Sequence, residues 1–372
     1  MARGTASDQN VHKSGDSIAS LVEQQALEWL CELFELPKSF KGVMPTGATG
    51  CNFLGACIAR QFVGQQQGID VAKQGVYGLE IEFFSTTPHA SMIKSLGMAG
   101  LGQQNVTLVD SIVNSEAMDV NALARQLDNS NSKGKVVIAS AGTVTTTDFD
   151  DLTAIAKLCT QHNAWLHVDA AFGLFERVVT GVNGKTKGIE LADSITVDCH
   201  KWLNVPYDCG VFLTRHLDLL EQSFDVPAPY LANFSSEPDF MSLGIENSRR
   251  FRALPVWLSL LAYGKQGIKQ WVSSNINLSK QLANWIDDSI DYELVHPCQM
   301  NVILFRPSAG NLSQQQIDEK TKKLLQAINK DGRIYLSPGH WQGNEIIRVA
   351  LSNWQTDEND IKIAIQVLQE LK

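Results

Sequence analysis

Two residues with complementary chemistry follow two apolar, strand-like segments of this chain. Lys201 lies in ADSITVDCHKWLNVPYDCGVFL (192–213), and Asp169 lies in AWLHVDAAFG (164–173). A lysine amine forms a Schiff base with an aldehyde. A carboxylate keeps a pyridine nitrogen protonated, so that the ring accepts electrons from a carbanion. An enzyme that depends on pyridoxal 5'-phosphate (PLP) needs both groups, so we predict PLP as the cofactor and both residues as catalytic and cofactor-binding.

The alternative interpretations are a surface lysine and a helix N-cap aspartate. The apolar neighbours Trp202 and Leu203 favour a partly desolvated Lys201, whose amine can then lose its proton and become nucleophilic. Asp169 ends a strongly apolar strand, and a buried carboxylate without a partner is costly. A protonated ring nitrogen would be that partner. We place Ala171, two residues further on, among the cofactor-binding residues.

A turn of small residues, TGATG (46–50), precedes a predicted helix. Small residues let backbone N–H groups approach a phosphate, and the N-terminus of a helix favours an anion. We therefore expect Ala48 and Thr49 to bind the cofactor phosphate. A tight loop without a ligand is the alternative for such a turn.

The chain resembles the PLP-dependent (group II) amino-acid decarboxylases, which have the aspartate-aminotransferase fold (fold type I). HVDAAFG and HKWLNVPYDCG together are highly specific for that family, and three further segments occur in family order: TGATGCN (46–52), TTPHAS (86–91) and SRRFRALPVW (248–257). The resemblance runs from about Asp8 to the C-terminus and is greatest to a poorly characterised bacterial-type branch.

The resemblance implies decarboxylation of an L-amino acid to the amine through a Lys201 Schiff base. It implies that His89 stacks on the cofactor ring and positions the substrate carboxylate, although an ordinary histidine at a helix start is the alternative. It also implies phosphate contacts from His200 and Thr143, and a homodimer with the active site near the interface.

Two departures from the family pattern keep other functions open. Relatives usually carry some tens of residues before the segment that matches SDQN, and we expect that region to help line the substrate pocket. Phe240 stands where aromatic amino-acid decarboxylases have a proton-donating tyrosine, on a register counted back from Arg249. The alternatives are an aldehyde-forming enzyme, another PLP carbon–carbon lyase, and an inactive PLP-fold protein.

Other polar residues are weaker candidates. His167 shares a strand face with Asp169, because side chains two apart point the same way, and we interpret it as structural. Arg348 could anchor a substrate carboxylate or lie on a surface or between domains. For Arg249 and Arg250 the structural interpretation is favoured.

Composition narrows the function classes. The chain has 372 residues and a net charge of −9 with no basic block, which argues against nucleic acid as a partner. No apolar run approaches the roughly 20 residues that span a bilayer, and the N-terminus lacks the apolar core of a secretory signal. Seven scattered cysteines without metal-site spacing indicate a reducing cytoplasm and no metal centre.

The order of predicted elements indicates an α/β protein. Strand-like runs at 77–84, 105–110, 135–140, 164–169, 194–198 and 210–214 alternate with helical runs at 89–100, 119–129 and 151–162. This alternation is typical of a mostly parallel sheet with helices on both faces, whose ligands bind beyond the carboxyl ends of the strands.

A small α+β segment is predicted to follow, with strands near 292–296, 301–306, 332–336 and 345–350. We therefore expect an N-terminal helical segment at 1–36, a large PLP-binding domain at 37–265 and a small C-terminal domain at 266–372.

Overall fold

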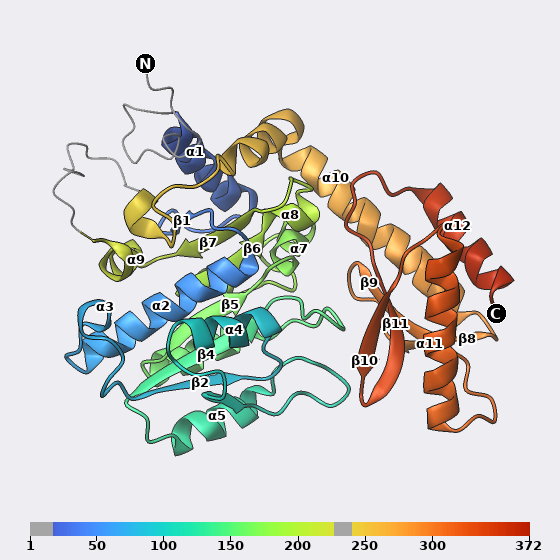
Figure 1. Cartoon of the computed structure of the whole chain (residues 1–372), viewed down its shortest axis with the longest axis horizontal. Helices are drawn as coiled ribbons and strands as arrows, with labels where there is room; N and C mark the ends of the chain where they lie inside the picture. Colours follow the sequence, from blue (N-terminus) through green and yellow to red (C-terminus); the bar gives the residue numbers. More distant parts are fainter. Residues whose placement is uncertain (1–17, 227–239) are drawn as a thin grey trace. The chain divides into compact units, whose positions relative to one another are not determined.

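The computed structural model describes residues 18–226 and 240–372, and the chain separates into two compact units (Figure 1). The first unit contains the residues up to Gly142 together with Phe149–Ile268, and the second contains Thr143–Asp148 and Lys269–Lys372. The three-part division expected from the sequence stays a prediction. Among the described residues, no helix is long and apolar enough to span a membrane.

A seven-stranded sheet forms the centre of the first unit, in the order β1-β7-β6-β5-β4-β2-β3. Its strands are β1 (Lys41–Val43), β2 (Ile81–Ser85), β3 (Val106–Leu108), β4 (Gly134–Ser140), β5 (Trp165–Asp169), β6 (Ser194–Asp198) and β7 (Gly210–Thr214). The strands β2 to β6 pair in parallel, whereas β7 is antiparallel to β6 and β1 is antiparallel to β7.

Helices cover both faces of this sheet. Side chains alternate between the two faces of a strand, and consecutive residues of β6 and β7 are all buried. The helices of the unit are α1 (Ala19–Leu33), α2 (Ala48–Gln66), α3 (Val71–Gln74), α4 (Ala90–Met98), α5 (Val120–Asn129), α6 (Leu152–Gln161), α7 (Glu176–Thr180), α8 (Cys199–Trp202), α9 (Leu217–Phe224) and the start of α10 (Ala253–Asp287). The predicted mostly parallel sheet between helices is confirmed.

The second unit is a small α+β body, as expected. Its antiparallel sheet has the order β10-β11-β9-β8, with strands β8 (Tyr292–His296), β9 (Val302–Pro307), β10 (Ser337–Trp341) and β11 (Asn344–Ala350). The helices α11 (Gln314–Asp331) and α12 (Glu358–Glu370) belong to the same unit and share a hydrophobic core with the sheet. Buried side chains such as Ile286, Phe305, Ile328 and Val367 form its core.

The strand predicted at 332–336 is wrong, because the strand begins only at Ser337. Gln342 and Gly343, both with positive φ, form a tight turn that sets the register of the β10–β11 hairpin. The backbone of Leu336 is instead satisfied by the amide side chain of Asn329, which donates to its carbonyl at 3.0 Å and accepts from its N–H at 2.9 Å. The apolar pattern of this segment does not indicate this hydrogen-bond partner.

Candidate active site

Lys201 lies on α8, the single helical turn that follows β6 at the carboxyl edge of the sheet. Its side chain is half-buried, and its Nζ lies 3.1 Å from Oδ2 of Asp198. The same Nζ lies 5.6 Å from the centre of the Phe172 ring. The amine is thus held between a carboxylate and an aromatic face and is still reachable from solvent.

Asp198 connects this lysine to the start of α2. The carboxylate is buried, and its Oδ1 accepts the backbone N–H of Ala48 at 2.7 Å. The first N–H groups of a helix have no intrahelical partner, so an aspartate is stabilised there by the helix dipole as well as by the hydrogen bond. The carboxylate therefore fixes the α2 N-terminus beside the Lys201 amine.

The backbone of β7 passes unusually close to this N-terminus. A Cβ on Gly210 would lie 2.6 Å from the Cα of Gly47 and 2.8 Å from the sulfur of Cys51. Gly47 itself has φ 155° and ψ −175°, a region that side chains with a Cβ rarely adopt. Glycine at both positions lets α2 begin directly over the end of the sheet.

Asp169 ends β5, the strand that neighbours β6. Its Oδ2 accepts Nδ2–H of Asn52 at 3.0 Å, and its Oδ1 accepts the backbone N–H of Ala171 at 3.2 Å. Within residues 18–226 and 240–372, no cation pairs with this carboxylate. A negative charge with two donors and no counter-cation is what a protonated ring nitrogen would complement.

His167 lies two residues before Asp169 and is fully buried. Its Nε2 is 3.0 Å from Oδ1 of Asn52, and its Nδ1 is 2.8 Å from the hydroxyl of Ser194. Burial lowers the pKa of His167 from 6.5 to about 4, outweighing the opposite effect of the Asp169 charge. The imidazole is therefore neutral near pH 7, and its hydrogen bonds are structural.

His89 is the N-cap of α4 and is exposed. Its Nδ1 accepts the backbone N–H of Ser91 at 3.2 Å and lies 2.7 Å from the Ser91 hydroxyl. Because Nδ1 is an acceptor, the neutral ring carries its proton on Nε2. Ser91 also lies 3.0 Å from Nδ2 of Asn52, so hydrogen bonds connect His89 to the residue that holds Asp169.

His200 precedes Lys201 and packs against Tyr207, with ring centres 4.4 Å apart. Its Nδ1 lies 2.9 Å from the carbonyl of Cys209. The imidazole also lies next to Gly47, because a Cβ on that glycine would be 3.2 Å from its Cε1. His200 thus lies at the α2 N-terminus, where a phosphate contact was predicted.

The remaining candidates have other surroundings. Thr143 belongs to the second unit, where its hydroxyl lies 3.0 Å from that of Thr146. Arg348 also belongs to that unit and donates from Nε to the carbonyl of Val144 at 2.8 Å. Arg249 forms a buried ion pair with Glu23 at 2.7 Å, consistent with the structural interpretation.

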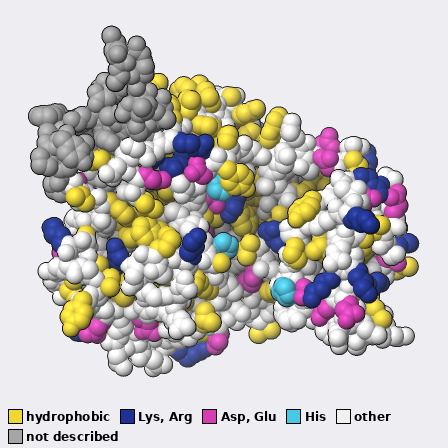
Figure 2. Space-filling model, viewed as in Figure 1, with side chains coloured by type: hydrophobic (Ala, Val, Ile, Leu, Met, Phe, Trp, Pro, Cys, Tyr) yellow, Lys and Arg dark blue, Asp and Glu magenta, His cyan; other side chains and the backbone are white. Residues whose placement is uncertain are grey.

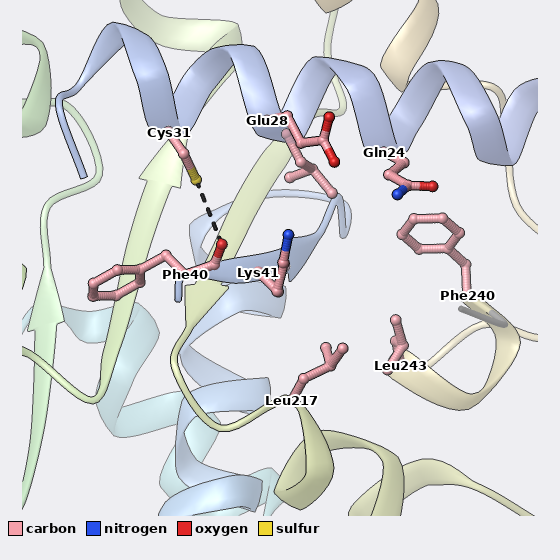
Figure 3. A pocket seen from close by; sticks show the side chains of 10 residues that line it. Gln24, Glu28, Cys31, Phe40, Lys41, Leu217, Phe240 and Leu243 are labelled. Carbon is pink, nitrogen blue, oxygen red and sulfur yellow. Dashed lines mark hydrogen bonds between the residues drawn. The ribbon is translucent and has the colours of Figure 1, made fainter. Parts of the chain in front are cut away.

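Phe240 lines an apolar cavity of about 110 Å³ beside α1 (Figure 3). Leu27, Leu217 and Leu243 line the same cavity, and the guanidinium of Arg249 lies 5.1 Å from the Phe240 ring. Phe240 is buried in these contacts. The expectation that it marks the position of a proton donor stays a prediction.

Sequence reasoning missed three polar residues of this site: Asn52, Ser91 and Asp198. Asn52 is an amide within the apolar run CNFLGACIA, and a fully buried amide needs partners. Asp198 likewise ends an apolar strand one turn before the lysine. Both were detectable as polar residues at buried positions, but the identity of their partners was not.

These residues fit PLP on the observations above. Asp169 presents a carboxylate without a counter-cation, Lys201 presents a reachable amine, and α2 presents a helix N-terminus at the same edge of the sheet. PLP needs a group for its ring nitrogen, a group for its aldehyde and a group for its phosphate. Each of the three needs has a matching group.

Comparisons with known proteins agree with this site. The family model for the pyridoxal-dependent decarboxylase conserved domain matches residues 3–308. The aromatic-L-amino-acid decarboxylase of Bacillus atrophaeus is 30% identical over 95% of this chain and 73% of its own length. The phenylacetaldehyde synthase of Arabidopsis thaliana is 25% identical over 95% of this chain and 74% of its own length.

A solved structure shows the same fold. The tryptophan decarboxylase of Catharanthus roseus in complex with L-tryptophan superposes with a TM-score of 0.85 at 23% identity, covering 97% of this chain and 76% of that one. Fold and site thus define a PLP-dependent enzyme of fold type I. The chain belongs to the pyridoxal-dependent decarboxylase family, so PLP is its cofactor and decarboxylation is its reaction class.

The buried His167 predicts how stability depends on pH. Its pKa is about 4 in the folded chain and 6.5 as its ordinary value. Between these values the unfolded chain binds more protons, so stability rises with pH and is lost as pH falls from 6.5 towards 4. Since a pKa difference of one corresponds to about 1.4 kcal/mol, the loss from His167 is roughly 3 kcal/mol.

Urea unfolding at several pH values from 4 to 7.5 measures this loss in the wild type and in His167→Gln. The variant is expected to be less stable at pH 7 but to lose less on acidification, by the amount that His167 contributes. Parallel curves for the two proteins would contradict the assignment of a neutral, buried imidazole.

Proposed function

We propose that the protein decarboxylates an L-amino acid to the corresponding amine, with Lys201 as the amine that attaches to PLP. The observation that carries the proposal is the placement of Lys201 and Asp169. Asp169 ends β5 and Lys201 follows the neighbouring parallel strand β6, and Asp169 pairs with Thr196 in the register of the two strands. Both groups therefore lie at the same edge of the sheet, where such folds bind ligands.

In this proposal each residue has one task. Bound PLP supplies an electron sink for the electron pair that remains at Cα when CO₂ leaves. Asp169 holds the proton on the ring nitrogen, which keeps that sink effective. Asp198 orients the Lys201 amine from 3.1 Å. His89 offers Nε2–H to the substrate carboxylate and its ring face to the cofactor.

The phosphate is proposed to lie at the N-terminus of α2. The N–H of Ala48 is already engaged by Asp198 at 2.7 Å, so the predicted contact at Ala48 requires sharing that donor. Thr49 is the next residue of the same turn, and its backbone N–H has no intrahelical acceptor. His200, which lies beside Gly47, is the further proposed phosphate contact in the first unit, and Ala171 is proposed to lie along the ring. The contact predicted for Thr143 stays a prediction.

The substrate proposed first is an aromatic L-amino acid, because the B. atrophaeus relative carries that activity in its name. Aldehyde formation is the second candidate, because Phe240 is predicted to stand at the position of the proton-donating tyrosine and an A. thaliana relative is a phenylacetaldehyde synthase.

Product analysis tests both candidates. Purified protein with PLP is incubated with L-tryptophan, L-tyrosine, L-phenylalanine, L-glutamate and cysteine sulfinate, and CO₂, amine, aldehyde and peroxide are measured. The expected result is CO₂ and amine in equal amounts from at least one aromatic substrate. Lys201→Ala should lose this activity by several orders of magnitude, whereas Lys94→Ala, at an exposed lysine of α4, should keep it.

Aldehyde with an equal amount of peroxide would select the second candidate. CO₂ release by Lys201→Ala at the wild-type rate would contradict the role of Lys201.

We further propose that the protein is a homodimer that uses the outer face of the first part of α10. Leu254, Leu258 and Leu261 recur at helical spacing and expose 37%, 49% and 57% of their surface. Hydrophobic side chains gather over this part of the molecule in Figure 2. An exposed apolar stripe of this kind is typical of an interface.

Light scattering after size-exclusion chromatography tests the dimer. The chain has a mass of 41.0 kDa, and the wild type is expected to elute with twice that mass. Leu258→Glu together with Leu261→Glu should shift the mass to that of the monomer, because two charges would be buried in the interface. Leu191→Glu, at an exposed leucine elsewhere, is the control. A monomeric wild type would contradict the proposal.

A cytoplasmic setting is also proposed. All seven cysteines lie in the described residues and each is free, as expected in a reducing compartment. Cell fractionation should recover the protein with cytoplasmic markers.

A further inference from the structure

Asn52 is the residue through which two parts of the proposed site are connected. It lies on α2 in the first unit and is fully buried. Its Nδ2 lies 3.0 Å from Oδ2 of Asp169 and 3.0 Å from the hydroxyl of Ser91. One side-chain amide therefore contacts the proposed ring-nitrogen partner and, through Ser91, reaches His89.

Both acceptor positions of the Asn52 side-chain oxygen also have hydrogen-bond partners. Oδ1 of Asn52 accepts from the hydroxyl of Thr196 at 2.7 Å and faces Nε2 of His167 at 3.0 Å. An amide has two N–H donors and two acceptor positions on its oxygen. All four are occupied, so the amide has a single orientation that satisfies its neighbours.

The direction of each hydrogen bond follows from this orientation. Because Oδ1 of Asn52 is an acceptor, His167 must carry its proton on Nε2, which leaves Nδ1 to accept from Ser194 at 2.8 Å. The hydroxyl of Ser194 in turn accepts Nε1–H of Trp165 at 3.0 Å. Burial that lowers the pKa of His167 to about 4 keeps the imidazole in this neutral, one-proton form.

The packing around His167 fixes the position of its imidazole ring beside Asn52. A Cβ on Gly55, one turn after Asn52 on α2, would lie 2.7 Å from Cε1 of His167. Glycine at this position leaves the space that the imidazole occupies between α2 and β5. The ring cannot rotate away from Asn52 without meeting the helix.

The second N–H of the Asn52 amide leads towards His89. The hydroxyl oxygen of Ser91 accepts from Asn52, so the hydroxyl proton of Ser91 can be donated to Nδ1 of His89 at 2.7 Å. This bond reaches the same Nδ1 that accepts the backbone N–H of Ser91 at 3.2 Å. The same amide thus orients the Asp169 carboxylate and, through the Ser91 hydroxyl, holds the His89 ring.

We propose that Asn52 is a positioning residue of the decarboxylase site, which orients Asp169 towards the cofactor ring nitrogen and, through the Ser91 hydroxyl, holds the His89 ring in place. The inference rests on the proposed function, because it assumes that Asp169 and His89 act on PLP and substrate. Asn52 itself touches neither.

The test compares three variants with the wild type, by PLP titration in the visible range and by steady-state kinetics. Asn52→Leu removes the hydrogen bonds to Asp169 and to Ser91, and Ser91→Ala removes only the connection from Asn52 to His89. Gln61→Leu is the matched control, because Gln61 is an equally buried amide on α2 whose partners are Asp70 and Ala72. Thermal unfolding of each apo-protein measures the purely structural cost.

Asn52→Leu is expected to bind PLP about ten- to hundredfold more weakly, the change that loss of a hydrogen bond to a charged group causes. Its absorption band should shift relative to the wild type, because the ring nitrogen loses its fixed partner. Ser91→Ala should keep the PLP affinity and the band, and should lower kcat/KM mainly through KM. Gln61→Leu should lose thermal stability without changing the band or the PLP affinity.

A second variant covers the case in which Asn52→Leu does not fold. Asn52→Thr retains one hydroxyl donor, so its PLP affinity should lie between those of the wild type and of a donor-free site. Wild-type PLP affinity and absorption spectrum in Asn52→Leu or Asn52→Thr would overturn the proposal. Equal losses of PLP affinity in Asn52→Leu and Gln61→Leu would also overturn it. A wild type that forms no adduct with PLP at Lys201 would instead overturn the proposed function.

Discussion

The negative charge of Asp169 at the end of a buried strand is the constraint on which the rest of the site depends. A carboxylate in such a place is costly unless donors and a counter-charge surround it. The first unit supplies two donors, from Asn52 and from the backbone of Ala171, but no cation in the part of the chain that the structure describes. In the proposed function, the protonated ring nitrogen of PLP would supply the positive charge that this carboxylate lacks.

The other features of the site follow from how the chain satisfies this requirement. The parallel pairing of β5 and β6 brings Asp169 and the Lys201 turn to one edge of the sheet. The glycines at 47 and 210 allow α2 to begin at that edge, which brings Asn52 within reach of the carboxylate. The geometry of the site thus depends on where α2 begins as much as on the candidate catalytic residues.

Much of this arrangement could be predicted from the sequence. Asp169 ends one mainly apolar strand and Lys201 closely follows another, and that pattern has few interpretations in an α/β protein. The antiparallel edge strand β1 is three residues long and has no such run, so it was missed. The start of β10 was misplaced because the side chain of Asn329, seven residues earlier, satisfies the Leu336 backbone.

The hydrogen-bond partners of buried polar residues could not be predicted. His167 was expected to be structural from strand alternation alone, which is consistent with its burial. Its bond to Asn52, however, joins residues from a helix and a strand far apart in the chain. Likewise, no role was predicted for Asp198 from the sequence, whereas the structure shows that its carboxylate accepts the backbone N–H of Ala48. The periodicity of apolar residues predicts which residues are buried, but only the folded structure shows which buried polar side chains form hydrogen bonds with one another.

Mapping of the PLP attachment site tests the central claim most directly. The protein is loaded with PLP, reduced with borohydride, digested and analysed by mass spectrometry, alongside Asp169→Asn and Lys201→Ala. The account predicts a pyridoxyl group on Lys201 in the wild type, weaker loading in Asp169→Asn and no specific adduct in Lys201→Ala. A specific adduct on another lysine, or undiminished loading in Asp169→Asn, would contradict it.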